Sequence, residues 1–382
     1  MPLDECRVEV VLGTSPDASP EPDPRPVRCR NMLEITKRSL VTTLVRIHAG
    51  HFRITLSLCS QALLWRVLAV PDPVPIPAFR GLFRDLPSAA FAFLWTVSLS
   101  VLALLTFLYL LRCVFCFDAV RSEFTHHVGV NYLFAPSISW LLLLQASSQF
   151  VLAPGGFRYR LLWWVFLIPV LVLDVAVYGQ WFTKGKRFLS IVANPTCQMS
   201  VIGNLMGARV AAETGWKEVS ICLFSLGFTH YLVIFVTLYQ RIAGSKSLPA
   251  MLRPVFFLFV AAPSTASIAW SSIAGSFDNA SKMLFYLSLF LLTSLISRPA
   301  LFRKSMKKFS LAWWAYSFPL TVLALASAQY TGTVEGLPSR VLKHALSSIS
   351  IIVFIVLTVL TGINNNSLFL PANKDAKQDQ GM

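Results

Sequence analysis

The sequence predicts an all-α integral membrane protein with ten transmembrane helices. Of its 382 residues, 55% are hydrophobic and 13% are charged, whereas a soluble domain carries roughly 25% charged residues. The 29 Phe and 10 Trp are spread over the whole chain instead of marking one core. Because each span needs about 20 mainly apolar residues, the chain has room for roughly ten spans and short loops. This composition argues against a soluble enzyme.

Polar segments are expected at both ends of the chain. Residues 1–47 include SPDASPEPDPRP, whose Pro and acidic residues predict a disordered cytosolic tail. The start is not typical of a signal peptide, in which basic residues precede an apolar stretch. Residues 364–382 form a second polar tail, which we also expect in the cytosol. Residues 48–363 are the predicted ten-helix transmembrane domain.

Ten apolar runs define the expected spans. They lie near residues 49–70, 89–113, 129–151, 160–181, 194–212, 217–240, 251–273, 280–300, 309–330 and 339–363. The loops after the even spans hold thirteen Lys and Arg residues, and those after the odd spans hold seven. Since Lys and Arg accumulate on the cytoplasmic side of a membrane, this distribution predicts that both termini are cytosolic.

A proline motif repeats along the odd spans. FAPSISW, NPTCQMS, AAPSTASIAW and SFPLTVLALASA contain Pro136, Pro195, Pro263 and Pro319, which are 59, 68 and 56 residues apart. This spacing is the length of one helical hairpin. Proline removes a helical hydrogen bond and kinks the helix, which a lipid-facing span tolerates poorly. We therefore expect five tandem helical hairpins, with five kinked inner helices around a central pore and five straighter outer ones. The alternative is that the prolines only aid helix packing.

Eight segments, in order along residues 48–363, form a recognisable set. They are AGHFRITLSLCSQALLW (49–65), FAPS (134–137), YGQW with KGKR after it (178–187), NPTCQMSVIGN (194–204), GFTHYLVIFVTLYQR (227–241), AAPSTASIAW (261–270), FSLAWWAYSFPLT (309–321) and PSR (338–340). Together they resemble the plant slow-type (S-type) anion channel family. That family belongs to the broader tellurite-resistance/dicarboxylate transporter group.

The resemblance implies a ten-helix fold, a pore formed by the odd helices, and a homotrimer or a heterotrimer with homologous subunits. It implies passive conduction of nitrate and chloride, with malate as a further candidate, across the plasma membrane. The family's pore gate is a Phe directly before the proline of the ninth helix, which is Phe318 here. The chain is similar to the short-tailed homologues, so a regulatory kinase, which acts largely through long tails, stays an open partner.

Hydroxyl side chains follow the prolines and are candidates for lining the pore. They are Ser137, Ser200, Ser264, Thr265 and Thr321. Hydroxyl donors can partly replace the hydration shell of an anion without trapping it, as conduction requires. The alternative for each is a hydroxyl bonded to a carbonyl of its own helix.

Basic residues near the expected pore are candidates for attracting anions. Arg53 and Arg209 lie inside or near the ends of odd spans, where a charge marks a water-filled path or a partner. Lys186 and Arg187 follow the fourth span and could steer anions towards the inner vestibule. As alternatives, Arg209 could pair with Glu213 four residues on, and the other two could be orientation signals at lipid headgroups.

Other chemical classes find no support in the sequence. It has no nucleotide loop, metal-binding helix motif or nucleophile elbow, so we expect neither enzyme activity nor a cofactor. Cys113 and Cys116 with His126 and His127 lack the spacing of a zinc site, so we expect no metal. The net charge of +15 does not form a solvated basic face, so nucleic acid is not an expected partner. The expected surroundings are the lipid bilayer and inorganic anions.

Three functions are therefore weighed. The first is a passive nitrate and chloride channel gated by Phe318. The second is a modulatory, weakly conducting subunit of heteromeric anion channels. The third is a coupled transporter of dicarboxylates or other anions, but such carriers usually need an ionisable residue at the membrane midplane, and the odd spans offer no convincing one.

Overall fold

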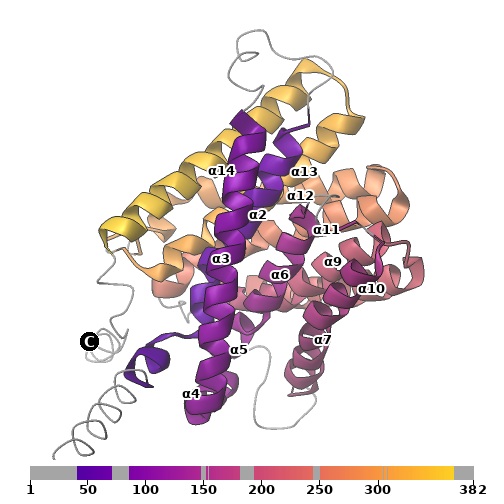
Figure 1. The fold of residues 1–382 in the computed structure, drawn as a ribbon. Helices are drawn as coiled ribbons and strands as arrows, with labels where there is room; N and C mark the ends of the chain where they lie inside the picture. Colours follow the sequence, from indigo (N-terminus) through magenta and orange to yellow (C-terminus); the bar gives the residue numbers. More distant parts are fainter. Residues whose placement is uncertain are drawn as a thin grey trace, which may run out of the picture. The chain divides into compact units, whose positions relative to one another are not determined.

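The computed structural model describes residues 41–70, 86–147, 152–153, 155–180, 193–243, 250–303, 305–307 and 309–364 (Figure 1). The expected tails lie outside these residues up to residue 40 and from residue 365 on. Residues 1–43 form a unit separate from residues 44–382. All elements named below belong to the second unit, and every regular element in its described part is a helix.

Ten helices of 13 residues or more run through the described part of this unit and overlap the ten apolar runs in order. They are α2 (Phe52–Leu68), α3 (Leu86–Phe115), α6 (Phe134–Ala146), α7 (Phe157–Gly179), α9 (Gln198–Glu213), α10 (Lys217–Ala243), α11 (Leu258–Ala274), α12 (Asn279–Ile296), α13 (Ser317–Thr333) and α14 (Leu337–Ile363). A shorter helix, α4 (Phe117–Thr125), follows α3, and a 3-10 turn, η6 (Pro299–Leu301), follows α12.

Five of these helices form a closed ring. α2 packs against α6, α6 against α9, α9 against α11, α11 against α13, and α13 again against α2. The other five, α3, α7, α10, α12 and α14, each pack against the inner helix that precedes them in the chain and against the next inner helix around the ring. The structure thus has the five inner and five outer helices that the alternating sequence pattern predicts.

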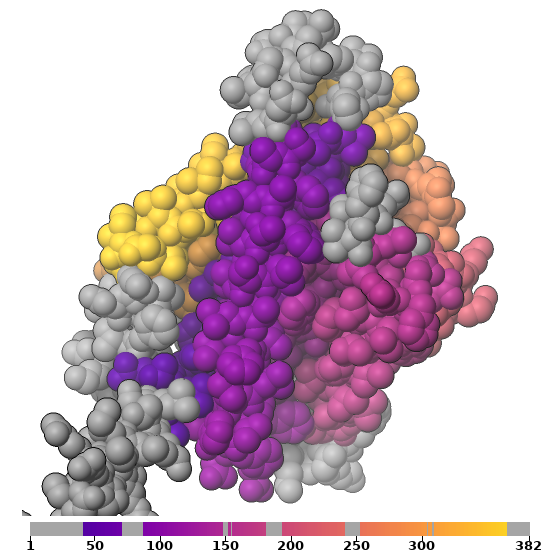
Figure 2. All heavy atoms as spheres, in the orientation of Figure 1, coloured from indigo at the N-terminus to yellow at the C-terminus, as the bar shows by residue number. Residues whose placement is uncertain are grey.

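The two groups differ in burial as an inner ring and a lipid-facing shell should. In the stretches of α11 and α13 apolar enough to cross a membrane, 78% of the residues are buried. The corresponding stretches of the five outer helices are 11–33% buried. α3, which runs along the face shown in Figure 2, exposes Phe107, and α12 exposes Phe290. So much exposed apolar surface is anomalous in water but fits hydrocarbon contact.

Fewer than ten of the described helices are long and apolar enough by themselves to cross a membrane. Length and composition qualify seven helices, or eight if α4 is joined across a 109° bend to residues Gly129–Ala146. α2 and α9, with 17 and 16 residues, are not among the helices that qualify. Their polar and small residues match their place in the ring, where protein and not lipid surrounds them.

Each inner helix starts with a short separate helical segment. The five segments are η1 (Ala49–His51) before α2, α5 (Gly129–Tyr132) before α6, η4 (Pro195–Cys197) before α9, η5 (Ala250–Phe257) before α11 and η7 (Leu311–Ala315) before α13. This break recurs five times, including before α2, which has no proline in the motif. It is therefore a property of the ring and not only of the proline.

The four repeated prolines differ in position from the expected kink within a span. Pro136 and Pro319 are the third residues of α6 and α13, and Pro195 is the first residue of η4. The first backbone N–H groups of a helix have no intrahelical acceptor, so proline costs no hydrogen bond there and favours a helix start. Pro263 alone of the four lies deeper, at the sixth residue of α11.

Candidate functional site

The rotation of each inner helix decides which side chains face the interior of the ring. Successive residues of an α-helix are turned by about 100°, so residues two apart lie on nearly opposite sides, and residues three or four apart share a side. A side chain that contacts an outer helix therefore identifies, two positions away, a side chain that faces the interior. This geometry sorts the candidate residues into two groups.

Phe318 is a buried residue of the first turn of α13. Leu320, two residues later, lines an apolar cavity of about 370 Å³ together with Ile352 and Val353 of the outer helix α14. Phe318, nearly opposite Leu320 on the helix, is therefore turned away from this cavity, and it is only 2% exposed.

Thr321 belongs to the group that contacts outer helices. Its hydroxyl lies 2.9 Å from Ser350 Oγ of α14 and accepts a hydrogen bond from Gln61 Nε2 of α2 at 3.1 Å. It also donates to the carbonyl of Ser317 in its own helix. These contacts join α2, α13 and α14, so the structure gives Thr321 a packing role in place of the expected pore lining.

Ser200 is also turned outwards. Its hydroxyl lies 2.6 Å from the hydroxyl of Tyr178 in the outer helix α7. One turn later Asn204 donates to the buried carboxylate of Asp174, also in α7, at 2.6 Å. This side of α9 is a polar interface with α7, so Ser200 does not face the interior as expected.

Ser137 shares a side of α6 with Trp140, three residues later. The indole of Trp140 donates to Thr106 Oγ1 of α3 at 3.1 Å and stacks on Phe166 of α7 with 5.1 Å between ring centroids. That side of α6 faces two outer helices. Ser137 therefore lies towards the shell, contrary to the expectation of pore lining.

Ser264 and Thr265 have the same hydrogen bond but opposite surroundings. Each hydroxyl donates to the carbonyl four residues earlier in α11, at 2.8 Å, as the alternative in the sequence analysis anticipates. Ser267 donates to the carbonyl of Ser281 in the outer helix α12 at 2.7 Å. Thr265, two residues before Ser267, is therefore turned to the interior, whereas Ser264, three residues before it, shares its outward side.

Arg53 is the second residue of α2 and lies where the inner helices begin. Its Nε donates to the carbonyl of Gly50 at 2.9 Å, and its guanidinium carbon lies 4.6 Å from the ring centroid of Tyr132 in α5. Ser57, one turn later on the same side, is fully buried, and its hydroxyl has no hydrogen-bond partner in the described part of the chain. Leu58, the residue after Ser57, packs with Phe354 and Leu357 of the outer helix α14.

Arg209 occupies an interior-facing position of α9. A Cβ at Gly207, two residues earlier, would lie 2.5 Å from Leu167 Cδ1 of α7, so that side faces the shell. The Arg209 Nε donates to Glu213 Oε1 at 2.9 Å, which is the pairing named as an alternative. One of its terminal nitrogens has no hydrogen-bond partner among the described residues.

Gln198 is a functional candidate that sequence reasoning missed. It is the first residue of α9, is fully buried, and has no hydrogen-bond partner for either amide atom among the described residues. Ser200, two residues later, faces α7, so Gln198 faces the interior of the ring. The sequence signal for Gln198 is its position one turn after Pro195 in NPTCQMS. Lys186 and Arg187 lie outside the described residues.

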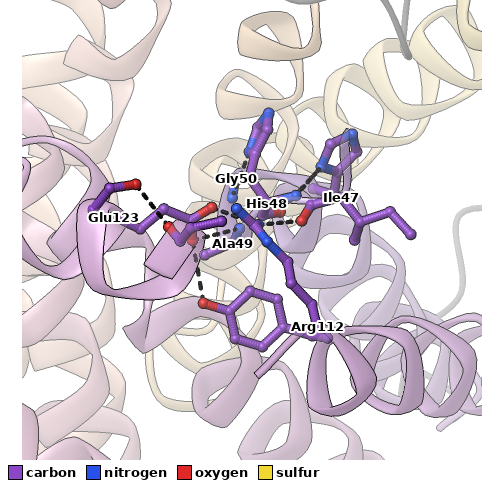
Figure 3. A network of polar contacts seen from close by, with 10 residues as sticks. Ile47, His48, Ala49, Gly50, Arg112 and Glu123 are labelled. Atoms are coloured by element: carbon purple, nitrogen blue, oxygen red, sulfur yellow. Dashed lines mark hydrogen bonds and ion pairs between the residues drawn. The ribbon is translucent and has the colours of Figure 1, made fainter. Parts of the chain in front are cut away.

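A polar network fixes the segment that leads into α2 (Figure 3). Arg112, near the end of α3, forms a 2.5 Å ion pair with Glu123 of α4 and donates to the carbonyl of Ile47. Glu123 also accepts from the hydroxyl of Tyr109 at 3.1 Å and from the amide of Ala49 at 3.4 Å. The Arg112 side chain is 4% exposed and the Glu123 side chain 14%. This buried pair ties the start of the first inner helix to the elbow between α3 and α4.

The charges of the inner helices are strongly unequal. The residues of α2, α6, α9, α11 and α13 include three Arg and a single acidic residue, Glu213, which pairs with Arg209. The interior side carries donors of several kinds, from guanidinium to amide and hydroxyl. Such an interior favours negative ions over positive ones.

Comparison with known proteins identifies the family. The family model described as voltage-dependent anion channel (SLAC1) matches residues 46–362. The chain belongs to the SLAC1 family of anion channels. The match covers the whole ring and shell described above, and the family consists of channels, not enzymes, as the sequence predicts.

Relatives within the SLAC1 family come from Arabidopsis thaliana. The S-type anion channel SLAH1 is 55% identical over 329 residues, which are 86% of this chain and 84% of that protein. The S-type anion channel SLAH4 is 53% identical over 344 residues, or 90% and 91% of the two chains. The guard cell S-type anion channel SLAC1 is 43% identical over 318 residues, which are 83% of this chain but 56% of that protein. The fuller coverage of the first two agrees with the predicted likeness to short-tailed homologues.

Proposed function

We propose that the chain is a passive channel that conducts nitrate and chloride across the plasma membrane through the ring of five inner helices. The observation that carries the proposal is the charge of these helices, with three Arg and one acidic residue that is already paired. The names of the relatives, which are S-type anion channels, support the same function.

Selectivity in this proposal follows from the wall chemistry. The interior side combines apolar residues with single donors such as Thr265 and Gln198. The one carboxylate in the five described inner helices, that of Glu213, is paired with Arg209. Isolated donors replace only part of a hydration shell. Weakly hydrated anions such as nitrate lose less on partial dehydration than strongly hydrated ones, so nitrate is expected to pass at least as well as chloride.

Gating is assigned to Phe318 within the same proposal. A buried phenyl ring turned to the interior of a narrow apolar passage stops anions both by its bulk and by excluding water. The support is the position of Phe318 opposite Leu320 on α13 and the family resemblance of the Phe-Pro pair.

Location and assembly complete the proposal. Cytosolic termini are supported by the excess of Lys and Arg in the loops after even spans. A homotrimer, or a heterotrimer with homologous subunits, rests on the family resemblance, as do malate as a further permeant anion and a regulatory kinase acting on the tails. Lys186 and Arg187 are assigned to steering anions at the cytosolic face on the strength of their charge.

Reversal potentials test the channel function. In voltage clamp of cells expressing the chain, we expect the reversal potential to shift by close to 58 mV per tenfold change in external nitrate or chloride, the roughly Nernstian value for a monovalent ion at room temperature. The shift should be absent when only external cations are exchanged. Proton-dependent uptake without current would favour the coupled transporter instead.

Co-expression distinguishes the modulatory subunit from the channel. If the chain alone carries no current but changes the current of a long-tailed homologue, the subunit hypothesis replaces autonomous conduction. Against the coupled transporter, the buried Asp174 does not face the ring interior, because it lies at the interface of α7 and α9 and accepts a hydrogen bond from Asn204.

A further inference from the structure

The side-chain amide of Gln198 is a buried polar group whose hydrogen bonds are not accounted for by the described residues. A primary amide has two donor hydrogens and an acceptor oxygen, and buried polar groups are almost always hydrogen-bonded. Both amide atoms of Gln198 lack a partner among the described residues, although the side chain is fully buried. Leaving such a group unsatisfied costs free energy, so its orientation towards the ring interior points to a ligand or water there.

The start of α9 is joined to the start of α2 by α5. Asn131 of α5 donates to Thr196 Oγ1 at 2.9 Å, two residues before Gln198. The next residue, Tyr132, lies under the guanidinium of Arg53. Since α5 contacts both η1 and η4, Arg53 and Gln198 lie at the same end of the ring. This end is where the inner helices begin.

Charge balance at this end favours a negative ligand. The Arg53 guanidinium contacts neutral groups, the carbonyl of Gly50 and the aromatic ring and hydroxyl of Tyr132. The nearest acidic side chain in the network is Glu123, and its carboxylate is paired with the buried Arg112. No carboxylate among the described residues pairs with Arg53, so a cation there would be repelled by the guanidinium, whereas an anion would meet that charge together with an amide donor.

We propose that Gln198 and Arg53 form an anion-binding station at the end of the ring where the inner helices begin. The Gln198 Nε2 donates a hydrogen bond that replaces one water of the permeant ion, and Arg53 supplies the attracting charge. The ligand class is a small monovalent anion such as nitrate or chloride. This inference rests on the proposed function and deepens it. A single amide and one charge hold an ion weakly enough for it to leave, as conduction requires.

Gln198→Leu tests the station, with Gln145→Leu as the matched control. Gln145 is also a buried Gln of an inner helix, but its Nε2 is directed at the carbonyl of Met206. We expect the nitrate concentration for half-maximal conductance to rise about tenfold or more in Gln198→Leu, the effect of losing one hydrogen bond to a charged group. Gln145→Leu should leave it unchanged. Gln198→Met, which keeps an unbranched side chain, serves if the Leu variant folds poorly.

Binding measured without current separates this inference from the channel function. We expect nitrate, compared with gluconate at equal ionic strength, to raise the unfolding temperature of the purified wild-type chain and of Gln145→Leu, but not of Gln198→Leu. If the wild-type chain carries no current, but nitrate raises its unfolding temperature and does not raise that of Gln198→Leu, the result would contradict conduction and support the station. If the wild-type chain conducts, and both Gln198→Leu and Gln198→Met have the same half-saturating nitrate concentration as the wild type, the station is wrong. The channel function would then stand.

Discussion

Replacing Phe318 by Ala is expected to raise the basal anion current on the order of tenfold or more at equal amounts of protein at the cell surface. The phenyl ring is buried and lies opposite Leu320 on α13, and the proposed function assigns it to the gate. Removing it widens and wets the narrowest apolar part of the passage. The measurement is steady-state current in nitrate, normalised to surface-labelled protein, because a Phe→Ala change in a packed region also costs about 3–5 kcal/mol of stability.

Leu320→Ala is the matched control for this experiment. Leu320 is two residues away on the same helix but faces the cavity beside α14, so its truncation removes apolar volume without opening the interior. We expect no increase in basal current. An equal leak in both variants, or an unchanged current in Phe318→Ala within a chain that conducts when activated, would contradict the gate.

Breaking the buried ion pair between Arg112 and Glu123 should strongly destabilise the chain. Arg112→Ala leaves the carboxylate of Glu123 in a buried site without its counter-charge, and it frees the carbonyl of Ile47. We expect the variant to lose about 3–5 kcal/mol of stability, as is typical when one partner of a buried pair is removed. Thermal unfolding of the purified chain measures the loss.

Two further variants show whether burial is the cause. Replacing both Arg112 and Glu123 by Met removes the charges together, so most of the lost stability should return. Glu213→Gln breaks the more exposed pair with Arg209 and should cost less than about 1 kcal/mol. A loss in Arg112→Ala no larger than that in Glu213→Gln would refute the structural role of the network.

The alternation of inner and outer helices could be predicted because it depends on composition. Leu- and Phe-rich spans must face lipid, and spans with small and hydroxyl residues must face protein. The closed ring from α13 back to α2 follows from the same pattern, repeated five times. The positions of the helices and their division into inner and outer groups could therefore be predicted from the sequence.

The direction of single side chains could not be predicted in the same way. Thr321 and Ser200 follow the prolines just as Thr265 does, yet they bond to outer helices, and only Thr265 faces the interior. Composition places a residue on a helix, but the rotation of that helix depends on packing against its neighbours, which a single sequence does not contain. For the same reason Gln198 was passed over.

The position of each proline within its helix also could not be predicted from the sequence. The missing backbone donor of proline predicts a kink within the span, whereas Pro136 and Pro319 lie in the first turn of their helices, where that donor has no partner to lose. Both interpretations follow from the same chemistry. Only the position of the helix start, set by the short segment before it, decides between them.

Modification of cysteines along α11 and α9 tests most directly whether anions pass through the ring. In the Phe318→Ala chain, Thr265→Cys faces the interior and Ser200→Cys faces α7. We expect a negatively charged methanethiosulfonate to reduce the nitrate current of Thr265→Cys by more than about half, because a fixed negative charge repels anions at short range. The Ser200→Cys and parent chains should keep their current. Equal inhibition of both cysteine variants, or none at Thr265→Cys despite labelling, would contradict a pathway through the ring.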